Sequence, residues 1–167
     1  YLYLAVDAPS RTYTAPAATF AFSQAVMNLE FTLTDLDSLL PSWQDQVKVT
    51  ATRGGVPVSY TAQVAGTLVQ PNSTTFYGTG GVASTDANAN VHLVFDGPVD
   101  RVVISFNDGP GATAANPGFH VVGVSDLSWQ KQNGEKVTHV NAVAVPPAGQ
   151  SYTGTYGSVT VFPDGTY

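Results

Sequence analysis

Residues 29–34 read Leu-Glu-Phe-Thr-Leu-Thr, so apolar and polar side chains alternate without a break. Successive side chains of a β-strand point to opposite faces, so Leu29, Phe31 and Leu33 would share one face. The same alternation recurs at residues 47–52, 91–95, 102–106 and 159–161. Val and Thr are frequent in these segments, and their branched side chains favour an extended backbone. The pattern predicts a series of strands that each bury one face.

Turn-forming residues separate the predicted strands. The signals are Arg53-Gly-Gly55, Asp96-Gly-Pro98, Asn107-Asp-Gly-Pro110 and Pro163-Asp-Gly165. Strands broken by such turns roughly every 8–12 residues are typical of sandwiches and barrels. The segment from Asp37 to Gln46 has some helical character, but its proline limits it to a short turn. We therefore predict an all-β, antiparallel β-sandwich of the jelly-roll or lectin-like kind.

Composition excludes several classes of function. The chain has 167 residues, of which 43% are hydrophobic and 11% charged, and it has no cysteine. Its net charge of −6, with only six Lys and Arg, argues against nucleic acid as a partner because phosphate binding needs a basic surface. No apolar run approaches the ~20 residues of a membrane-spanning helix, so we expect no membrane insertion.

The expected organisation is a sandwich domain over residues 1–145 and a hairpin over residues 146–167. That hairpin either completes the sandwich or begins the next repeat. The chain opens at Tyr1 without an initiating methionine or a signal peptide, so we expect it to be a monomeric module of a longer chain.

Two segments resemble each other. Residues 22–35 align without gaps on residues 95–108, an offset of 73 (95 − 22), with Phe, Val and the closing Asp identical. Each copy predicts a strand, a tight turn anchored by a valine (Val26 or Val99), a second strand and an acid at its end. Two such hairpins would fit the two halves of a sandwich, packed face to face.

The acids are mostly aspartate, which is favoured in turns and is a common calcium ligand in loops. Asp35 and Asp37 flank one residue, so a continuing strand would put both carboxylates on one face. The sequence therefore allows a calcium site. The alternative is that each acid accepts hydrogen bonds from its local backbone. The candidate metal ligands are Asp35, Asp37, Asp45, Asp108 and Asp126.

Two loop residues are candidates for ligand binding. Trp43, in a predicted loop beside Asp45, could stack on a ligand, and Asn116 lies in the glycine- and proline-rich loop 109–118. Trp129 ends an alternating segment, so we expect it to pack in the core.

Catalytic motifs are absent from the sequence. His92, His120 and His139 are scattered, and neither a Gly-x-Ser-x-Gly elbow nor a His-Glu-x-x-His motif occurs. His92 alternates with apolar residues, so its side chain should face solvent. We expect no catalytic residues and no enzymatic activity.

A resemblance to a known class rests on two segments. The run from Phe22 to Asp37, Phe-x-x-x-Val-x-Asn-Leu-x-Phe-Thr-Leu-Thr-Asp-Leu-Asp, resembles β domains of large bacterial surface proteins, as does the hairpin 95–99 with its closing residues 123–129. Residues 154–167 resemble the opening of the cadherin-like repeats found in tandem in such adhesins. Ala25 and Leu36 depart from the pattern, which more often has Pro and Ile there.

The resemblance implies an extracellular adhesive module at the bacterial cell surface or cell wall. Its loops would bind a host protein, peptide or glycan, with calcium as a possible cofactor. Two alternatives remain open: a structural spacer in a surface stalk, and a carbohydrate-binding appendage of a secreted enzyme.

Overall fold

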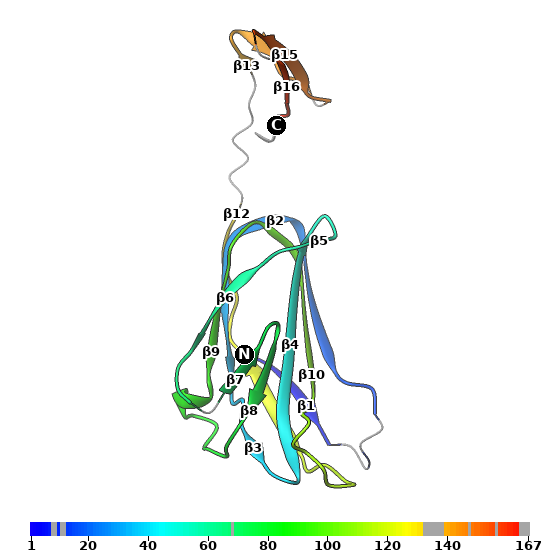
Figure 1. The fold of residues 1–167 in the computed structure, drawn as a ribbon, viewed down its shortest axis with the longest axis vertical. Helices are drawn as coiled ribbons and strands as arrows, with labels where there is room; N and C mark the ends of the chain where they lie inside the picture. Colours follow the sequence, from blue (N-terminus) through cyan, green and yellow to red (C-terminus); the bar gives the residue numbers. More distant parts are fainter. Residues whose placement is uncertain are drawn as a thin grey trace. The chain divides into compact units, whose positions relative to one another are not determined.

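The computed structural model describes residues 1–7, 10, 13–67, 69–131, 139–146, 148–155 and 157–163. The described chain is almost entirely β-structure with antiparallel pairing, and its one helical element is a short 3₁₀ turn at Ala87–Ala89 (Figure 1). The predicted all-β antiparallel class is confirmed. The chain divides into two compact units, Tyr1–Gln132 and Asn133–Tyr167.

The first unit holds β1 to β12. Their bounds are β1 (Leu2–Val6), β2 (Ala17–Thr34), β3 (Ser38–Leu39), β4 (Trp43–Arg53), β5 (Val56–Pro57), β6 (Tyr60–Val64), β7 (Val69–Asn72), β8 (Thr75–Gly78), β9 (Val91–Phe95), β10 (Val99–Asp108), β11 (His120–Val124) and β12 (Ser128–Lys131).

One strand, β2, belongs to both layers of the sandwich. Residues 17–21 and Val26 pair with β10, whereas residues 30–33 pair with β9 and the end of the strand pairs with β11. Asn28, with φ of 51°, lies between the two halves, where the strand bends over the top of the unit in Figure 1. Strands that change sheets at a bend are a known way to close a sandwich.

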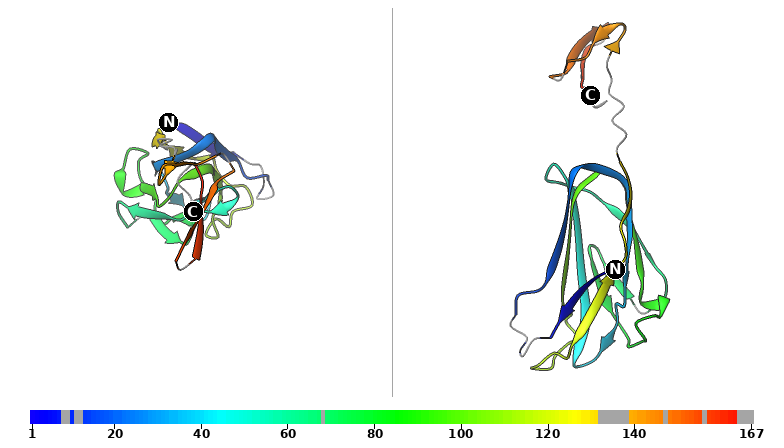
Figure 2. Two further views of the ribbon diagram at one scale, coloured as in Figure 1. Left: turned by 90° about the horizontal axis from the view of Figure 1, so that it is seen from above. Right: turned by 180° about the vertical axis from the view of Figure 1, so that it is seen from behind.

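The layers follow from this shared strand. One layer runs from the first half of β2 through β10, β4 and β8 to β7. The other contains β1, β11 and β12, the second half of β2, then β9 and β6. The β9–β10 turn also passes between the layers at this end, which we call the corner end (Figure 2).

The two similar segments meet at the corner end. Val26 lies opposite Val99 in the antiparallel ladder, and both are buried. Within the described residues this is the one ladder pair between the copies, because β10 otherwise pairs with residues 17–21 of β2 and residues 30–33 pair with residues 91–94, all outside the similar segments. The second strands of the two copies, residues 29–34 and 101–106, belong to opposite layers and contribute to the same core, as expected for two halves of a sandwich.

The core fills the space between the layers. Its largest fully buried side chains are Phe31, Phe76, Phe106, Leu29, Leu33, Leu36, Leu93 and Ile104. Leu29, Phe31 and Leu33 do share the inner face, as the alternation predicts. Burying such side chains supplies the main driving force for folding, at about 1.5–3 kcal/mol each.

The second unit has two small sheets of its own. β13 (His139–Val140) pairs with β14 (Val143–Ala144), and β15 (Gln150–Gly154) pairs with β16 (Gly157–Val161). This unit begins before the domain boundary drawn from the sequence after residue 145. No helix in the described ranges is long and apolar enough to cross a bilayer.

Candidate functional site

The end of the sandwich opposite the corners, which we call the loop end, brings two sequence-distant segments together. The turn between β3 and β4 packs beside the loop 109–119, which joins β10 to β11. Asp45 on β4 lies opposite Asp108 on β10, so two carboxylates enter this end from neighbouring strands. Trp43 and Asp45 both belong to β4, which corrects their predicted place in a loop.

His120, the first residue of β11, lies between these two carboxylates. Its Nδ1 is 2.7 Å from Asp45 Oδ1, and its Nε2 is 3.4 Å from Asp108 Oδ1. The His120 and Asp45 side chains have no exposed surface. The Nε2–Oδ1 contact is not a hydrogen bond, and both buried atoms lack a hydrogen-bond partner within the described structure. The His120–Asp45 pair is therefore the strong contact of the cluster.

Burial dominates the protonation of Asp45. Loss of solvent raises the pKa of Asp45 from 3.8 to about 7, against the lowering effect of its hydrogen bonds to His120 and to the backbone of Asp37. Burial also raises the pKa of Asp37, partly offset by the backbone N–H of Val82 and the nearby His120. A proton shared between Asp45 and His120 avoids an isolated buried charge, which would be costly.

Further hydrogen bonds connect the cluster to the surrounding backbone. Asp45 Oδ2 accepts from the Asp37 N–H at 3.0 Å, and Asp37 Oδ2 accepts from the Val82 N–H at 3.0 Å. The Tyr13 hydroxyl donates to Asp108 Oδ2 at 3.3 Å and accepts from the Asp108 N–H at 3.0 Å. These bonds hold the ends of β2, β4 and β10 in one arrangement.

Gln44 fastens the loop 109–119 to the sandwich. Its Nε2 donates to the Gly78 carbonyl at 2.7 Å, and its Oε1 accepts from the Gly111 N–H at 2.8 Å. The Pro41 carbonyl accepts from the N–H groups of Thr113 and Ala114, each at 3.0 Å. A glycine is required at position 78, because a Cβ there would overlap the backbone of Asp37. The loop is thus held in a defined position.

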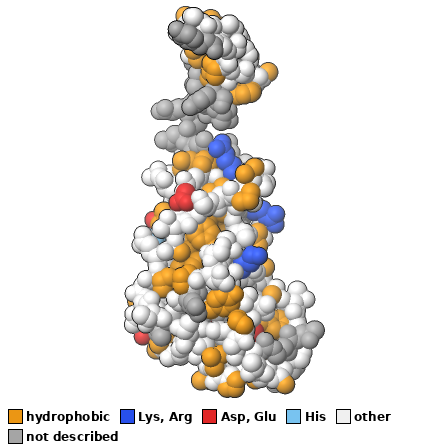
Figure 3. Space-filling model, viewed as in Figure 1, with side chains coloured by type: hydrophobic (Ala, Val, Ile, Leu, Met, Phe, Trp, Pro, Cys, Tyr) orange, Lys and Arg blue, Asp and Glu red, His pale blue; other side chains and the backbone are white. Residues whose placement is uncertain are grey.

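Apolar side chains are exposed around this buried cluster. Leu39, Leu40 and Phe119 are 60%, 52% and 62% exposed. Trp43 stacks on the His120 ring, with centroids 5.6 Å apart and planes at 11°, so one indole face is covered. The space-filling view shows apolar side chains at this lower end of the first unit (Figure 3). We call Leu39, Leu40, Trp43 and Phe119 the apolar tip.

The structure separates the sequence-predicted site residues into groups. Asp37, Asp45 and Asp108 meet around His120. Asp35 follows the end of β2 with φ of 63°, so the strand does not continue through it and the same-face argument does not apply. Burial and the Asp37 charge raise the pKa of Asp35.

The other predicted residues lie elsewhere or at the surface. The Asp126 side chain is 99% exposed and pairs with the N-terminal amine at 3.4 Å, away from the other acids. Asn116 is exposed in the loop near the apolar tip. His92 has a 37% exposed side chain and lies 3.5 Å from Glu30, consistent with its predicted solvent-facing position.

Sequence analysis missed His120. It is the first residue of a strand rather than part of a motif, and its partner Asp45 lies 75 residues away in the chain. Its one signal is an isolated histidine before the apolar run Val121–Val122.

A metal site is not evident in the part of the chain that the structure describes. No group of three or more His, Asp or Glu side chains there is arranged to hold a metal ion. Asp45 already uses one oxygen for His120 and the other for the Asp37 N–H. Calcium binding stays a prediction.

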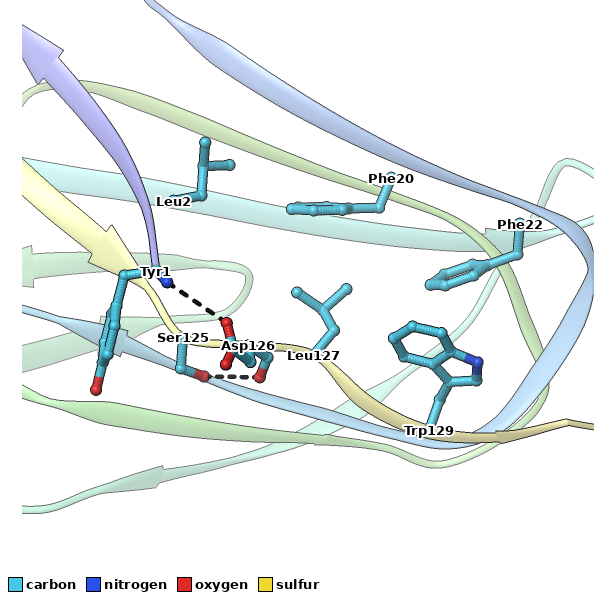
Figure 4. Close-up of a pocket in the computed structure, with 8 residues that line it drawn as sticks. All are labelled: Tyr1, Leu2, Phe20, Phe22, Ser125, Asp126, Leu127 and Trp129. Atoms are coloured by element: carbon cyan, nitrogen blue, oxygen red, sulfur yellow. Dashed lines mark hydrogen bonds and ion pairs between the residues drawn. The ribbon is translucent and has the colours of Figure 1, made fainter.

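A second feature of the first unit is an apolar pocket of about 430 Å³, lined by β2, the N-terminal residues Tyr1 and Leu2, and residues 125–129. Phe20 and Phe22 point into it from β2, toward Leu127 and Trp129 (Figure 4). Trp129 is 46% exposed and tilted against Phe22, with ring centroids 5.6 Å apart. Its predicted core position is therefore wrong: it lines an open pocket at the sandwich edge.

Comparison with known proteins identified no relative. No family model matches the chain, and neither the curated proteins nor the solved structures gave a match. The class that fold and site define is an antiparallel β-sandwich with an apolar tip over a buried Asp–His–Asp cluster.

Proposed function

We propose that the chain is an extracellular adhesive module that binds a host protein or peptide through its apolar tip. The observation that carries this proposal is the exposure of Leu39, Leu40 and Phe119 on one loop end. Exposed large apolar side chains gathered at one place mark interaction sites more often than isolated ones do. The resemblance to adhesin modules and the low content of charged residues support the same function.

The tip is held rigid before any ligand binds. Gln44, the Pro41 carbonyl and the buried His120–Asp45 pair fix the segments that carry the exposed side chains. Binding to a preorganised surface avoids the entropy cost of ordering loops, and thereby favours affinity. A spacer would not need this arrangement.

The chemistry of the tip favours a protein or peptide over a glycan. Sugar recognition relies on open aromatic faces, and one face of Trp43 is covered by His120. A Cβ on Gly118 would lie only 3.1 Å from Trp43 Cδ1, so the loop backbone also crowds the indole edge. Leucine and phenylalanine side chains instead suit an apolar patch on a protein partner.

A binding screen with matched variants tests the proposal. The full chain would be presented to panels of matrix proteins, peptides and glycans, followed by Phe119→Ala and Leu40→Ala on any protein ligand found. Each variant should lose about tenfold in affinity, as central apolar contacts usually do. Val56→Ala is the control, because Val56 is 66% exposed on β5 at the corner end.

Two results would contradict this function. Equal binding by Phe119→Ala and the natural chain would remove the tip from the interface. Recognition of glycans alone would favour the carbohydrate-binding alternative. Thermal unfolding in the presence of calcium and in the presence of a chelator tests the cofactor hypothesis separately. A ligand selective for the folded state raises the melting temperature, so equal melting temperatures would exclude a calcium cofactor.

A further inference from the structure

The first half of β2 forms a long free edge of the sandwich. Residues 17–21 pair with β10 on one side, and an irregularity at residues 22–25 precedes the next pair, Val26 with Val99. No described strand pairs with residues 17–25 on the other side. In an antiparallel strand alternate residues direct their N–H and C=O groups to opposite sides. Every second residue of this segment therefore offers unpaired backbone groups at the edge.

This edge lacks two of the usual protections against pairing, charge and proline, and its one irregularity lies beyond Ala21 at residues 22–25. Natural edge strands are short, charged, bulged or interrupted by proline. Three other outer strands follow that rule: β1 and β6 have five residues each, and β7 has four and contains Pro71. The free edge of β2 has neither a charged residue nor a proline between Ala17 and Ala25. Such an edge is suited to accept another strand.

The sequence of the edge is nearly symmetric about Ala21. Residues 19–23 read Thr-Phe-Ala-Phe-Ser. In an antiparallel pairing of two copies centred on Ala21, each Phe20 would lie opposite the other copy's Phe22, and each Thr19 opposite the other copy's Ser23. Aromatic pairs and hydroxyl pairs at directly opposed positions stabilise antiparallel ladders. No charged side chain of the segment would oppose a like charge.

The two faces of this pairing also match. Thr19, Ala21 and Ser23 are exposed and small, so they leave the outer face free of obstruction. Phe20 and Phe22 are half-buried on the inner face, where they line the open pocket beside Leu127 and Trp129 (Figure 4). Pairing would place four phenylalanines in one row and cover apolar surface that solvent now reaches.

We propose that two copies of this chain associate by antiparallel pairing of their β2 edges about Ala21. The pairing joins two five-stranded layers into one continuous sheet. It differs from the monomeric module that the sequence suggests. It uses a surface separate from the apolar tip, so it stands independently of the proposed adhesive function.

Charge substitution at the centre tests the pairing. Sedimentation velocity of the natural chain between about 10 µM and 1 mM should show a rising weight-average mass. Ala21→Asp and Ala21→Lys each place like charges opposite one another at the symmetry axis, so each alone should stay monomeric. An equimolar mixture of the two variants should recover the dimer, because the opposed charges then attract.

A second variant and a control complete the design. Thr19→Lys combined with Ser23→Glu in one chain should tighten self-association about threefold, since each introduced lysine faces the introduced glutamate of the other copy. Thr50→Asp, at an exposed position on the outer face of β4, should leave association unchanged. Equal melting temperatures would show that these variants fold alike.

Three outcomes would overturn the proposal. If the natural chain stays monomeric at about 1 mM, the β2 edge does not pair with a second copy, and its partner would be a strand of another protein. Ala21→Asp dimerising as well as the natural chain would place the contact elsewhere. Failure of the two charge variants to associate when mixed would show that β2 is not opposite itself.

Discussion

The two ends of the first unit are built on different physical principles. At the corner end, chain crossings are anchored by apolar contacts, with Val26 opposite Val99 in a buried ladder. At the loop end, Asp45 and His120 occupy an equally buried position. Burying an apolar side chain is favourable by itself. Burying a polar pair such as His120 and Asp45 is favourable only if the interaction between the two groups offsets the loss of their hydration. The corner end is thus stabilised by apolar contacts, whereas the loop end beside the apolar tip depends on the geometry of one buried polar pair.

The largest expected effect comes from breaking the pair at the loop end. His120→Ala leaves Asp45 buried without its partner and should lower the free energy of unfolding by about 3–5 kcal/mol. Urea unfolding measures the loss. Asp45→Asn and the double variant complete a cycle: the double variant should cost at least about 1 kcal/mol less than the sum of the single variants. Simple additivity would mean that the two side chains do not act as a pair.

The corresponding change at the corner end should cost less. Val99→Ala removes fully buried methyl groups and leaves a small cavity, with an expected loss of about 2 kcal/mol. The same urea experiment compares it directly with His120→Ala. A larger loss at Val99 than at His120 would reverse the proposed contrast between the ends.

The loop end alone should respond to pH. Because burial raises the pKa of Asp45 to about 7, the folded chain binds more protons than the unfolded chain between about pH 4 and 7. The stabilisation from this proton is complete below about pH 4 and is lost as pH rises through 7. Asp45 contributes up to about 1.4 kcal/mol per pH unit, which corresponds to one proton. The raised pKa values of Asp35 and Asp37 add to the slope in the same direction.

Chemical melts at several pH values between 4 and 8 measure this slope. Asp45→Asn is the matched control, since it keeps the shape but cannot titrate there. Stability that rises with pH in the natural chain, or an unchanged slope in the variant, would contradict the assignment to Asp45.

The smallest effect is expected at the bend of β2. Asn28 has φ of 51°, a conformation that costs residues other than Gly, Asn and Asp roughly 1 kcal/mol. Asn28→Ala should therefore lose about 1 kcal/mol, including its exposed hydrogen bond to Gln130. Asn28→Gly should stay within about 0.5 kcal/mol of the natural chain. Thermal melts distinguish the two, and equal losses would show that the backbone angle is not the cause.

Local alternation was sufficient to predict the strands but not their extent. The segments at residues 29–34, 47–52, 91–95, 102–106 and 159–161 all lie within strands. The full length of β2 was not predictable, because Ser23-Gln24-Ala25 interrupts the alternation at the irregularity of the β2–β10 ladder, shortly before the strand bends into the other layer. That interruption is a property of the tertiary structure, in which one strand serves two sheets.

The site was less predictable because its contacts join distant positions. Asp45 and Asp108 were candidates from the sequence, but only the β4–β10 register brings them together. Asp35 was misplaced because one positive φ angle ends the strand before it. His120 and the apolar tip depend on how the loop 109–119 folds back onto Gln44, and no local pattern encodes that contact.

The continuous backbone of β2 has a mechanical consequence. Two sheets held together only by side-chain packing can slide or peel apart as separate plates. Here the single strand β2 is hydrogen-bonded into both layers. Separating the layers therefore requires breaking the hydrogen bonds along one half of β2 or the other. Under an applied force the two layers should therefore unfold together rather than separate, because the backbone at Asn28 joins them.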